Sequence, residues 1–124
     1  MLNSPENNPD KAAKVFADDR ANVFHSWSAQ AQISPMAIAG GAGSYFWDFT
    51  GKKYLDFSCQ LVFTNIGHQH PKVIAAIKEQ ADILTTIAPQ HANEARNEAA
   101  KRILEISGDN FKKVFFTNAG ADGI

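Results

Sequence analysis

The chain has 124 residues, enough for one modest domain with its own core. Hydrophobic residues make up 44% and charged residues 20%, an ordinary globular composition, and the net charge of −1 excludes the basic footprint of a nucleic-acid-binding protein. No apolar run approaches the ~18 residues of a membrane span, and the first ten residues lack the pattern of a signal peptide. The only cysteine, Cys59, has no partner for an internal disulfide. These features predict a soluble, cytoplasmic protein.

The first forty-three residues predict a tail, a helix and a joint. Residues 1–9 are rich in asparagine and proline and predict a disordered tail. Asp10 is the expected N-cap of a helix that runs to about His25. Pro35 then interrupts a short apolar stretch, and the glycine-rich residues 40–43 are expected to form a flexible joint.

The clearest local signal is an antiparallel β-hairpin over residues 44–57. Both halves of this segment are rich in β-forming residues. Asp48 and Gly51 suit a type I turn between them, because aspartate accepts backbone hydrogen bonds and glycine adopts a positive φ. Trp47 is expected to lie in the core of the hairpin.

Two amphipathic helices are predicted next. The first begins at Pro71, where a missing N–H is no loss, and extends to about Ala88. Its apolar residues recur at helical spacing and form one stripe, namely Val73, Ile74, Ile77, Ala81, Leu84 and Ile87. The second helix ends near Gly108, and Glu98 and Arg102 are spaced along it for a surface ion pair.

The end of the sequence predicts a strand and an anion-binding loop. Residues 114–116 form a short, continuous apolar run, which favours a strand buried on both faces. The small residues 118–124 follow it directly. A strand, such a loop and a helix together form an anion site, because free backbone N–H groups and the positive helix end point the same way. The helix is not reached, so we expect the architecture to be interrupted here.

Three segments occur in an informative order: GSYFWDFTGKKYLDF at residues 43–57, NIGHQHP at residues 65–71 and VFFTNAGAD at residues 114–122. Together with the helices between them, they resemble the class III aminotransferases, the ω-aminotransferase branch of the fold type I pyridoxal-phosphate enzymes. The resemblance implies an α/β fold in which residues 10–70 carry the hairpin of a small domain. Residues 71–124 would begin the large cofactor-binding domain.

The resemblance also implies a cofactor, pyridoxal 5'-phosphate. In the family, backbone N–H groups of the loop hold its phosphate, and this role falls here on Gly120 and Ala121. Asp122 stands where the family usually has glutamate, close to the cofactor. The Schiff-base lysine and the carboxylate that binds the pyridinium nitrogen lie beyond residue 124 in the family. No catalytic residue is therefore expected in this chain.

Substrate contacts follow from the same resemblance. Trp27 would replace an aromatic residue that lines the family's substrate pocket, while its alternative place is a core. Leu61 and Val62 match positions whose side chains face the substrate. The implied reaction moves an amino group from a donor to the cofactor and then to an oxo acid such as pyruvate. The donor would be an ω-amino compound such as taurine or β-alanine, and the complete protein a homodimer.

Other interpretations compete with this one. His68 and His70 could suggest a metal site, but they lack a cysteine or carboxylate ligand at metal-motif spacing, which favours a turn that organises the next helix. Cys59 is expected to be a small buried residue and not a nucleophile. The second candidate function is a non-catalytic truncated product or interaction module, whose exposed apolar surface would bind a partner.

Overall fold

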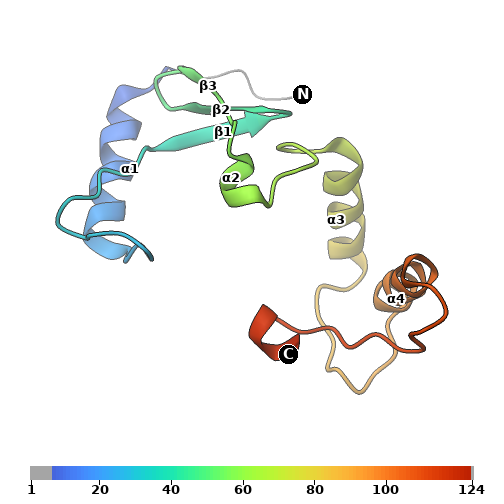
Figure 1. Ribbon diagram of the computed structural model, residues 1–124. Helices are drawn as coiled ribbons and strands as arrows, with labels where there is room; N and C mark the ends of the chain where they lie inside the picture. Colours follow the sequence, from blue (N-terminus) through green and yellow to red (C-terminus); the bar gives the residue numbers. More distant parts are fainter. Residues whose placement is uncertain (1–6, 124) are drawn as a thin grey trace. The chain divides into compact units, whose positions relative to one another are not determined.

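The computed structural model describes residues 7–123 and divides into two units, Met1–Glu79 and Gln80–Ile124, each of which is described by itself (Figure 1). In chain order the described elements are α1 (Pro9–Asn22), β1 (Ile38–Ala42), β2 (Tyr45–Asp48), β3 (Lys53–Leu55), α2 (Cys59–Val62), α3 (Pro71–Ile83), α4 (Glu94–Ser107) and the short 3-10 helix η1 (Gly120–Gly123). No helix of the described chain is both long and apolar enough to cross a bilayer.

Helix α1 begins earlier and ends earlier than the sequence predicted. The side chain of Asn8, and not that of Asp10, caps the helix by accepting a hydrogen bond from the Lys11 N–H at 3.0 Å. Pro9 takes the first helical position, so Asp10 lies in the first turn. Its negative charge there interacts favourably with the positive end of the helix dipole. The tail prediction is thus wrong for residues 8 and 9, and residues 1–6 lie outside the described part. The helix ends at Asn22, three residues before His25.

The predicted hairpin is confirmed, and it is part of a three-stranded antiparallel sheet in the order β1-β2-β3 (Figure 1). The prediction of a flexible joint at residues 40–43 is wrong, because Gly40 and Gly41 belong to β1 and pair with Trp47 and Phe46 of β2. Their small size explains this placement. A Cβ added to Gly40 would lie 3.0 Å from the Trp47 indole, so the glycine makes room for the large ring.

The hairpin turn and its core agree with the prediction. The Asp48 carboxylate accepts hydrogen bonds from the N–H groups of Thr50 and Lys52, and Gly51 has φ of +83°. Trp47, at 8% exposure, is the one apolar side chain that is buried among the described residues. Cys59, expected to be buried, is a free thiol that is only half-buried.

Helix α3 begins at Pro71 as predicted but ends at Ile83, five residues before the predicted end at Ala88. One further helical hydrogen bond, from the Leu84 N–H to the Gln80 carbonyl at 2.9 Å, extends its last turn. Apolar residues of the predicted stripe are exposed, and Val73, Ile77, Leu84 and Ile87 are among the large hydrophobic side chains at the surface.

Helix α4 ends at Ser107 with Gly108 as its C-cap, in agreement with the predicted end near Gly108. Asn93 caps its start by accepting from the Arg96 N–H at 3.0 Å. The predicted pairing of Glu98 with Arg102 is wrong. Glu98 instead accepts from Lys101 at 2.6 Å, because residues three apart on a helix are also neighbours. Both side chains are exposed, so this pair contributes little to stability.

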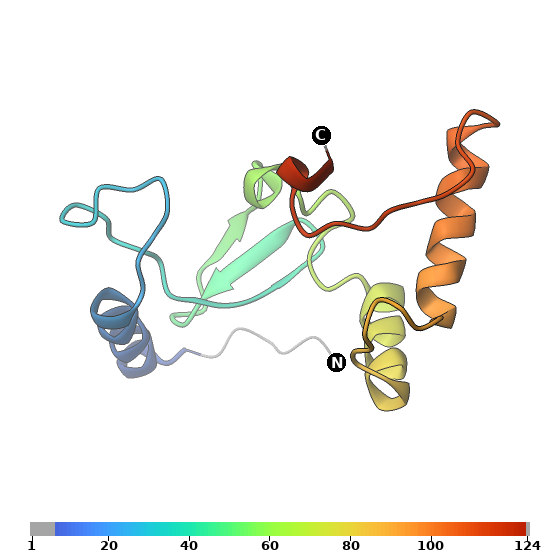
Figure 2. The same ribbon diagram turned by 90° about the horizontal axis from the view of Figure 1, so that it is seen from below.

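The strand predicted at residues 114–116 is not formed. This segment is irregular (Figure 2), and Phe115 is 86% exposed. A strand needs a neighbour for its N–H and C=O groups, and the described strands pair only with one another. The apolar run gives the segment a tendency to be buried, but Phe115 and Phe116 remain exposed within its own unit.

Candidate functional site

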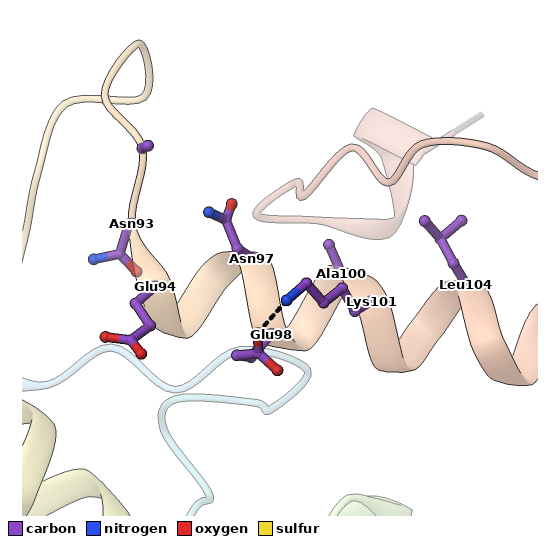
Figure 3. Close-up of a pocket in the computed structure, with 8 residues that line it drawn as sticks. Asn93, Glu94, Asn97, Glu98, Ala100, Lys101 and Leu104 are labelled. Carbon is purple, nitrogen blue, oxygen red and sulfur yellow. Dashed lines mark hydrogen bonds and ion pairs between the residues drawn. The ribbon is translucent and has the colours of Figure 1, made fainter.

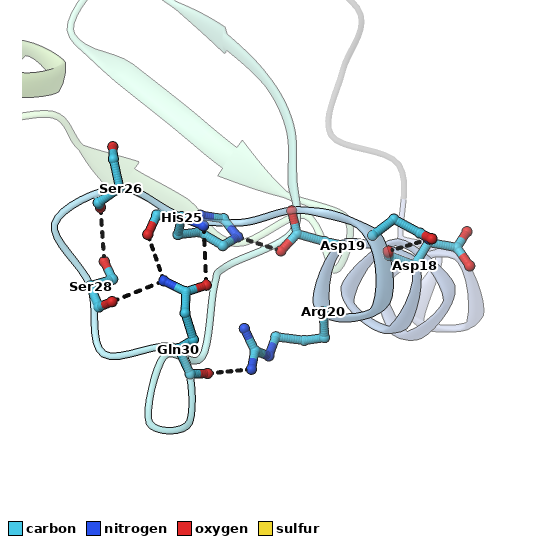
Figure 4. A network of polar contacts seen from close by, with 8 residues as sticks. Asp18, Asp19, Arg20, His25, Ser26, Ser28 and Gln30 are labelled. Atoms are coloured by element: carbon cyan, nitrogen blue, oxygen red, sulfur yellow. Dashed lines mark hydrogen bonds and ion pairs between the residues drawn. The ribbon is translucent and has the colours of Figure 1, made fainter.

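The loop after α1 carries Trp27 and is held by a polar network (Figure 4). His25 Nε2 lies 2.7 Å from Asp19 Oδ1 on α1, and the Arg20 guanidinium, also on α1, donates to the Gln30 carbonyl. The Gln30 side chain then fills the loop. Its Oε1 accepts from the His25 N–H at 3.1 Å, and its Nε2 donates to the Ser28 carbonyl at 2.9 Å. The loop backbone is therefore fixed from both ends.

Trp27 lies on this loop with φ of +57°, an uncommon conformation for a bulky residue. Its side chain is 97% exposed. The sequence left open whether Trp27 lines a pocket or lies in a core. Its exposure shows that it does not lie in the core of its own unit. The indole is presented outward by a loop whose hydrogen bonds involve other residues.

The segment with Leu61 and Val62 has an unusual backbone. Four successive residues that are not glycine, Cys59 to Val62, have φ between +49° and +65°, so α2 is a left-handed turn. Such a conformation costs roughly 1–2 kcal/mol per residue. The side chains of Leu61 and Val62 are 73% and 81% exposed, so burial within this unit does not offset the strain.

Asp56 and His68 fasten this turn to the sheet. The Asp56 carboxylate, on a residue only 8% exposed, accepts from the Gln60 N–H at 3.2 Å and lies 2.7 Å from His68 Nε2. Burial raises the pKa of this carboxyl, but the hydrogen bonds from His68 and Gln60 prevail and hold the pKa below its ordinary value. His68 also exchanges two backbone hydrogen bonds with Gly43, at 2.8 and 3.0 Å.

A pocket of about 390 Å³ lies beside this pair in the first unit. Its polar lining residues are Gln60, His68 and Gln69. The remaining lining residues are Met36, Ile38, Gly40, Gly41 and Phe46. A lining of apolar and polar residues is typical of pockets for small molecules.

The loop predicted to hold phosphate lies in the second unit and forms the single turn η1. Asp122 is turned back on this loop, since its carboxylate accepts from the Ala119 N–H at 3.2 Å and its own N–H donates to the Ala119 carbonyl at 3.1 Å. The amides of Gly120 and Ala121 are the first of the turn and have no acceptor within it. A Cβ on Gly120 would meet nothing within 4 Å. The two amides at the start of the turn are donors of the kind that a phosphate group binds.

Helix α4 carries a further hollow along one side (Figure 3). Its lining residues are Ala92, Asn93, Glu94, Asn97, Glu98, Ala100, Lys101 and Leu104. Lys101 donates to Glu98, and this hydrogen bond is the largest of the effects that raise its pKa. The raised pKa favours the protonated Lys101 amine, which is paired with Glu98.

No three potential metal ligands cluster in residues 7–123. The Nε2 atom of His68 is instead paired with Asp56. Among the residues predicted from the sequence, Leu61 and Val62 lie side by side on the turn, whereas Trp27 is on a separate loop of the same unit. Sequence reasoning missed Asp56 and treated His68 only as part of a turn.

Comparisons with known proteins agree on one family. Residues 27–124 match the model of the family described as aminotransferase class-III. The chain is 39% identical over 88 residues to an acetylornithine aminotransferase of Methanocaldococcus jannaschii, covering 71% of this chain and 22% of that one. It is 33% identical over 110 residues to the corresponding enzyme of Methanosarcina acetivorans, covering 89% and 26%.

Solved structures give the same result. A taurine:2-oxoglutarate aminotransferase from Bifidobacterium kashiwanohense, in complex with pyridoxal phosphate and glutamate, is 39% identical, with a TM-score of 0.85 over 90% of this chain and 25% of that chain. An S-selective transaminase from Arthrobacter sp. with alanine bound is 32% identical, with a TM-score of 0.81 over 89% and 24%. The chain thus spans about a quarter of the length of these relatives.

Proposed function

The chain belongs to the class III aminotransferases, with the mixed α/β architecture of an N-terminal portion of a fold type I transaminase, and we propose that it forms part of an enzyme that moves an amino group from an amine donor to an oxo acid. The observation that carries the proposal is the match over residues 27–124, which includes all three candidate site segments. Residues 10–70 would belong to the small domain, and residues 71–124 would begin the large one.

The cofactor of this enzyme would be pyridoxal 5'-phosphate, which when bound supplies the electron sink for the reaction. Gly120 and Ala121 would bind its phosphate through their backbone N–H groups, which are the first of the turn η1. Asp122 would act on the loop, because its carboxylate accepts from the Ala119 N–H. That contact satisfies the Ala119 N–H and leaves the N–H groups of Gly120 and Ala121 for the phosphate.

The substrate would meet Trp27, Leu61 and Val62, whose side chains are exposed on fixed backbone. We propose an ω-amino compound as donor, which is supported by the likeness to a taurine:2-oxoglutarate aminotransferase. The acceptor would be a small oxo acid such as pyruvate. A cytoplasmic homodimer completes the proposal.

Absorbance spectroscopy tests this function. The protein encoded by the whole reading frame around these residues should retain a visible absorbance after reconstitution with pyridoxal phosphate and dialysis, and an amine donor should change it. The 124-residue chain should become colourless on dialysis. Borohydride reduction and peptide mapping then locate the attached lysine. A colourless full-length protein would overturn the proposal, as would stoichiometric attachment at one lysine within residues 11–113.

A further inference from the structure

We infer that Asp56 and His68 are positioning residues, which hold the left-handed turn Cys59–Val62 so that Leu61 and Val62 face the substrate. This inference rests on the proposed function. It assigns a role to two residues that would not themselves touch substrate or cofactor. Their effect would be transmitted through the backbone of the turn.

The first support is the strain in the turn. Left-handed backbone at one residue other than glycine is uncommon, and here it occurs at four in succession. Strain of this kind persists only where the surroundings impose it, and it concentrates at sites that bind ligands. Leu61 and Val62 remain exposed, so packing in their own unit does not explain why the backbone adopts this form. A requirement to present these two side chains does explain it.

The second support is the way in which the turn is fastened. Asp56 Oδ1 accepts from the N–H of Gln60, which is a residue of the turn, while Asp56 Oδ2 pairs with His68. The Asp56 N–H in turn donates to the Ser44 carbonyl at 2.9 Å, and the backbone of His68 is bonded to Gly43. One buried carboxylate therefore connects the strained turn to the sheet. Without it, the turn would keep only its own short-range backbone bonds.

The packing around His68 points the same way. A Cβ added to Gly41 would lie 2.9 Å from His68 Cγ, and the ring of Phe46 meets the imidazole edge-on at 6.3 Å between centroids. The imidazole therefore lies against the sheet, near Gly41 and Phe46. A confined imidazole gives Asp56 a fixed partner, and a fixed Asp56 gives the Gln60 N–H a fixed acceptor.

The chain offers a matched control in Asp48. This aspartate also accepts backbone N–H groups in a turn of the same sheet, but its partners are Thr50 and Lys52 in the hairpin. Removing its carboxylate perturbs the sheet without touching Cys59–Val62. Asp48→Ala thus measures what a general loss of stability does to activity.

The functional test compares Asp56→Ala, Asp48→Ala and the conservative His68→Gln in the full-length enzyme, with a small and a bulky amine donor. Misplacing a contact by about 1 Å can change a rate ~100-fold. We expect Asp56→Ala to raise the KM of the donor and to change the ratio of kcat/KM between the two donors by roughly tenfold or more, within that range. Asp48→Ala should leave the ratio unchanged, and His68→Gln, which retains an N–H donor, should lie near the unsubstituted enzyme. An unchanged ratio in Asp56→Ala would overturn the inference.

A structural measurement separates this inference from the proposed function. Amide hydrogen exchange across residues 59–62 should accelerate at least about tenfold in Asp56→Ala and not in Asp48→Ala, since local opening governs exchange. Equal exchange in the two variants would overturn the positioning role. If Asp56→Ala does not fold, Asp56→Asn takes its place in both measurements. A different outcome would refute the proposed function and leave the positioning role intact. In that outcome, exchange at residues 59–62 accelerates in Asp56→Ala, but the unsubstituted protein catalyses no transamination.

Discussion

Replacing Trp47 by alanine should remove most of the stability of the first unit. Trp47 lies in the central strand β2, between Gly40 of β1 and Lys53 of β3 in register. It is 8% exposed, and no other apolar side chain among residues 7–123 is buried. The stability of the sheet therefore depends on one buried side chain, whereas a larger core would distribute it over several.

The magnitude follows from the buried area. A buried aromatic side chain removes ~150–250 Å² from water, and at about 25 cal/mol per Å² this corresponds to roughly 4–6 kcal/mol. Truncations of buried aromatic residues to alanine lower stability by about 3–5 kcal/mol. Small domains are stable by only about 5–15 kcal/mol. We therefore expect a loss of about 3–5 kcal/mol and a sheet that is largely unfolded at room temperature.

The two tryptophans provide the assay. Trp27 is 97% exposed, so a Trp27→Phe background leaves Trp47 as the sole tryptophan and its fluorescence as a probe of the sheet. Urea unfolding gives the free energy of this background, and circular dichroism gives that of Trp47→Ala. The control is Trp27→Ala, which should lie within about 0.5 kcal/mol of the unsubstituted chain as a surface change. A loss below about 1 kcal/mol in Trp47→Ala would refute the argument that this ring is the core.

Three further predictions concern smaller features. Gly41→Ala should destabilise the first unit by about 1–3 kcal/mol in urea unfolding, because the new methyl would lie 2.9 Å from His68 Cγ; a loss no larger than at a glycine facing open space would contradict this. Asn93→Ala should lower the stability of α4 by ~0.5–2 kcal/mol, since the Arg96 N–H loses its acceptor. Circular dichroism on heating measures this loss, and a melting curve identical to that of the unsubstituted chain would contradict the prediction. The contribution of Asp56 should disappear in acid.

Short-range signals were sufficient for the elements that depend on their own residues. The turn at Asp48 and Gly51 and the first residue of α3 at Pro71 were predicted because side-chain chemistry or a fixed φ decides them locally. The start of α1 was wrong because Asn8 and Asp10 are both good caps, and proline at the first helical position favours the earlier one.

Elements that depend on distant partners were not predictable in this way. Gly40 and Gly41 were predicted to form a flexible joint because glycine weakens strands. Only their neighbours in space, the Trp47 indole and His68, explain why small residues suit β1. The apolar run at residues 114–116 has strand character but no neighbouring strand in its unit. The left-handed turn at Cys59–Val62 carries no glycine and so gave no local signal.

The acid prediction for Asp56 rests on the sign of its pKa shift. Burial raises the pKa of the carboxyl, the hydrogen bonds from His68 and Gln60 lower it, and the result lies below the ordinary value. A depressed pKa in the folded state means that the ionised carboxylate stabilises the fold. This stability is fully present above the unfolded pKa of about 3.9 and is lost as the pH falls through the folded value.

Urea unfolding of the unsubstituted chain and of Asp56→Asn, followed from pH 6 to pH 2, measures this contribution. The difference between the two should be constant above about pH 5 and should shrink below about pH 4, where the carboxylate takes up its proton. The pKa of Asp48 is lowered too, chiefly by the Thr50 and Tyr54 side-chain hydrogen bonds, so Asp48→Asn should show the same trend. Amide exchange in acid separates the two contributions. Protonation of Asp56 should open residues 59–62, whereas protonation of Asp48 should open the hairpin turn. A difference for Asp56→Asn that persists to pH 2, or grows as the pH falls, would show that the ionised carboxylate is not what fastens the turn.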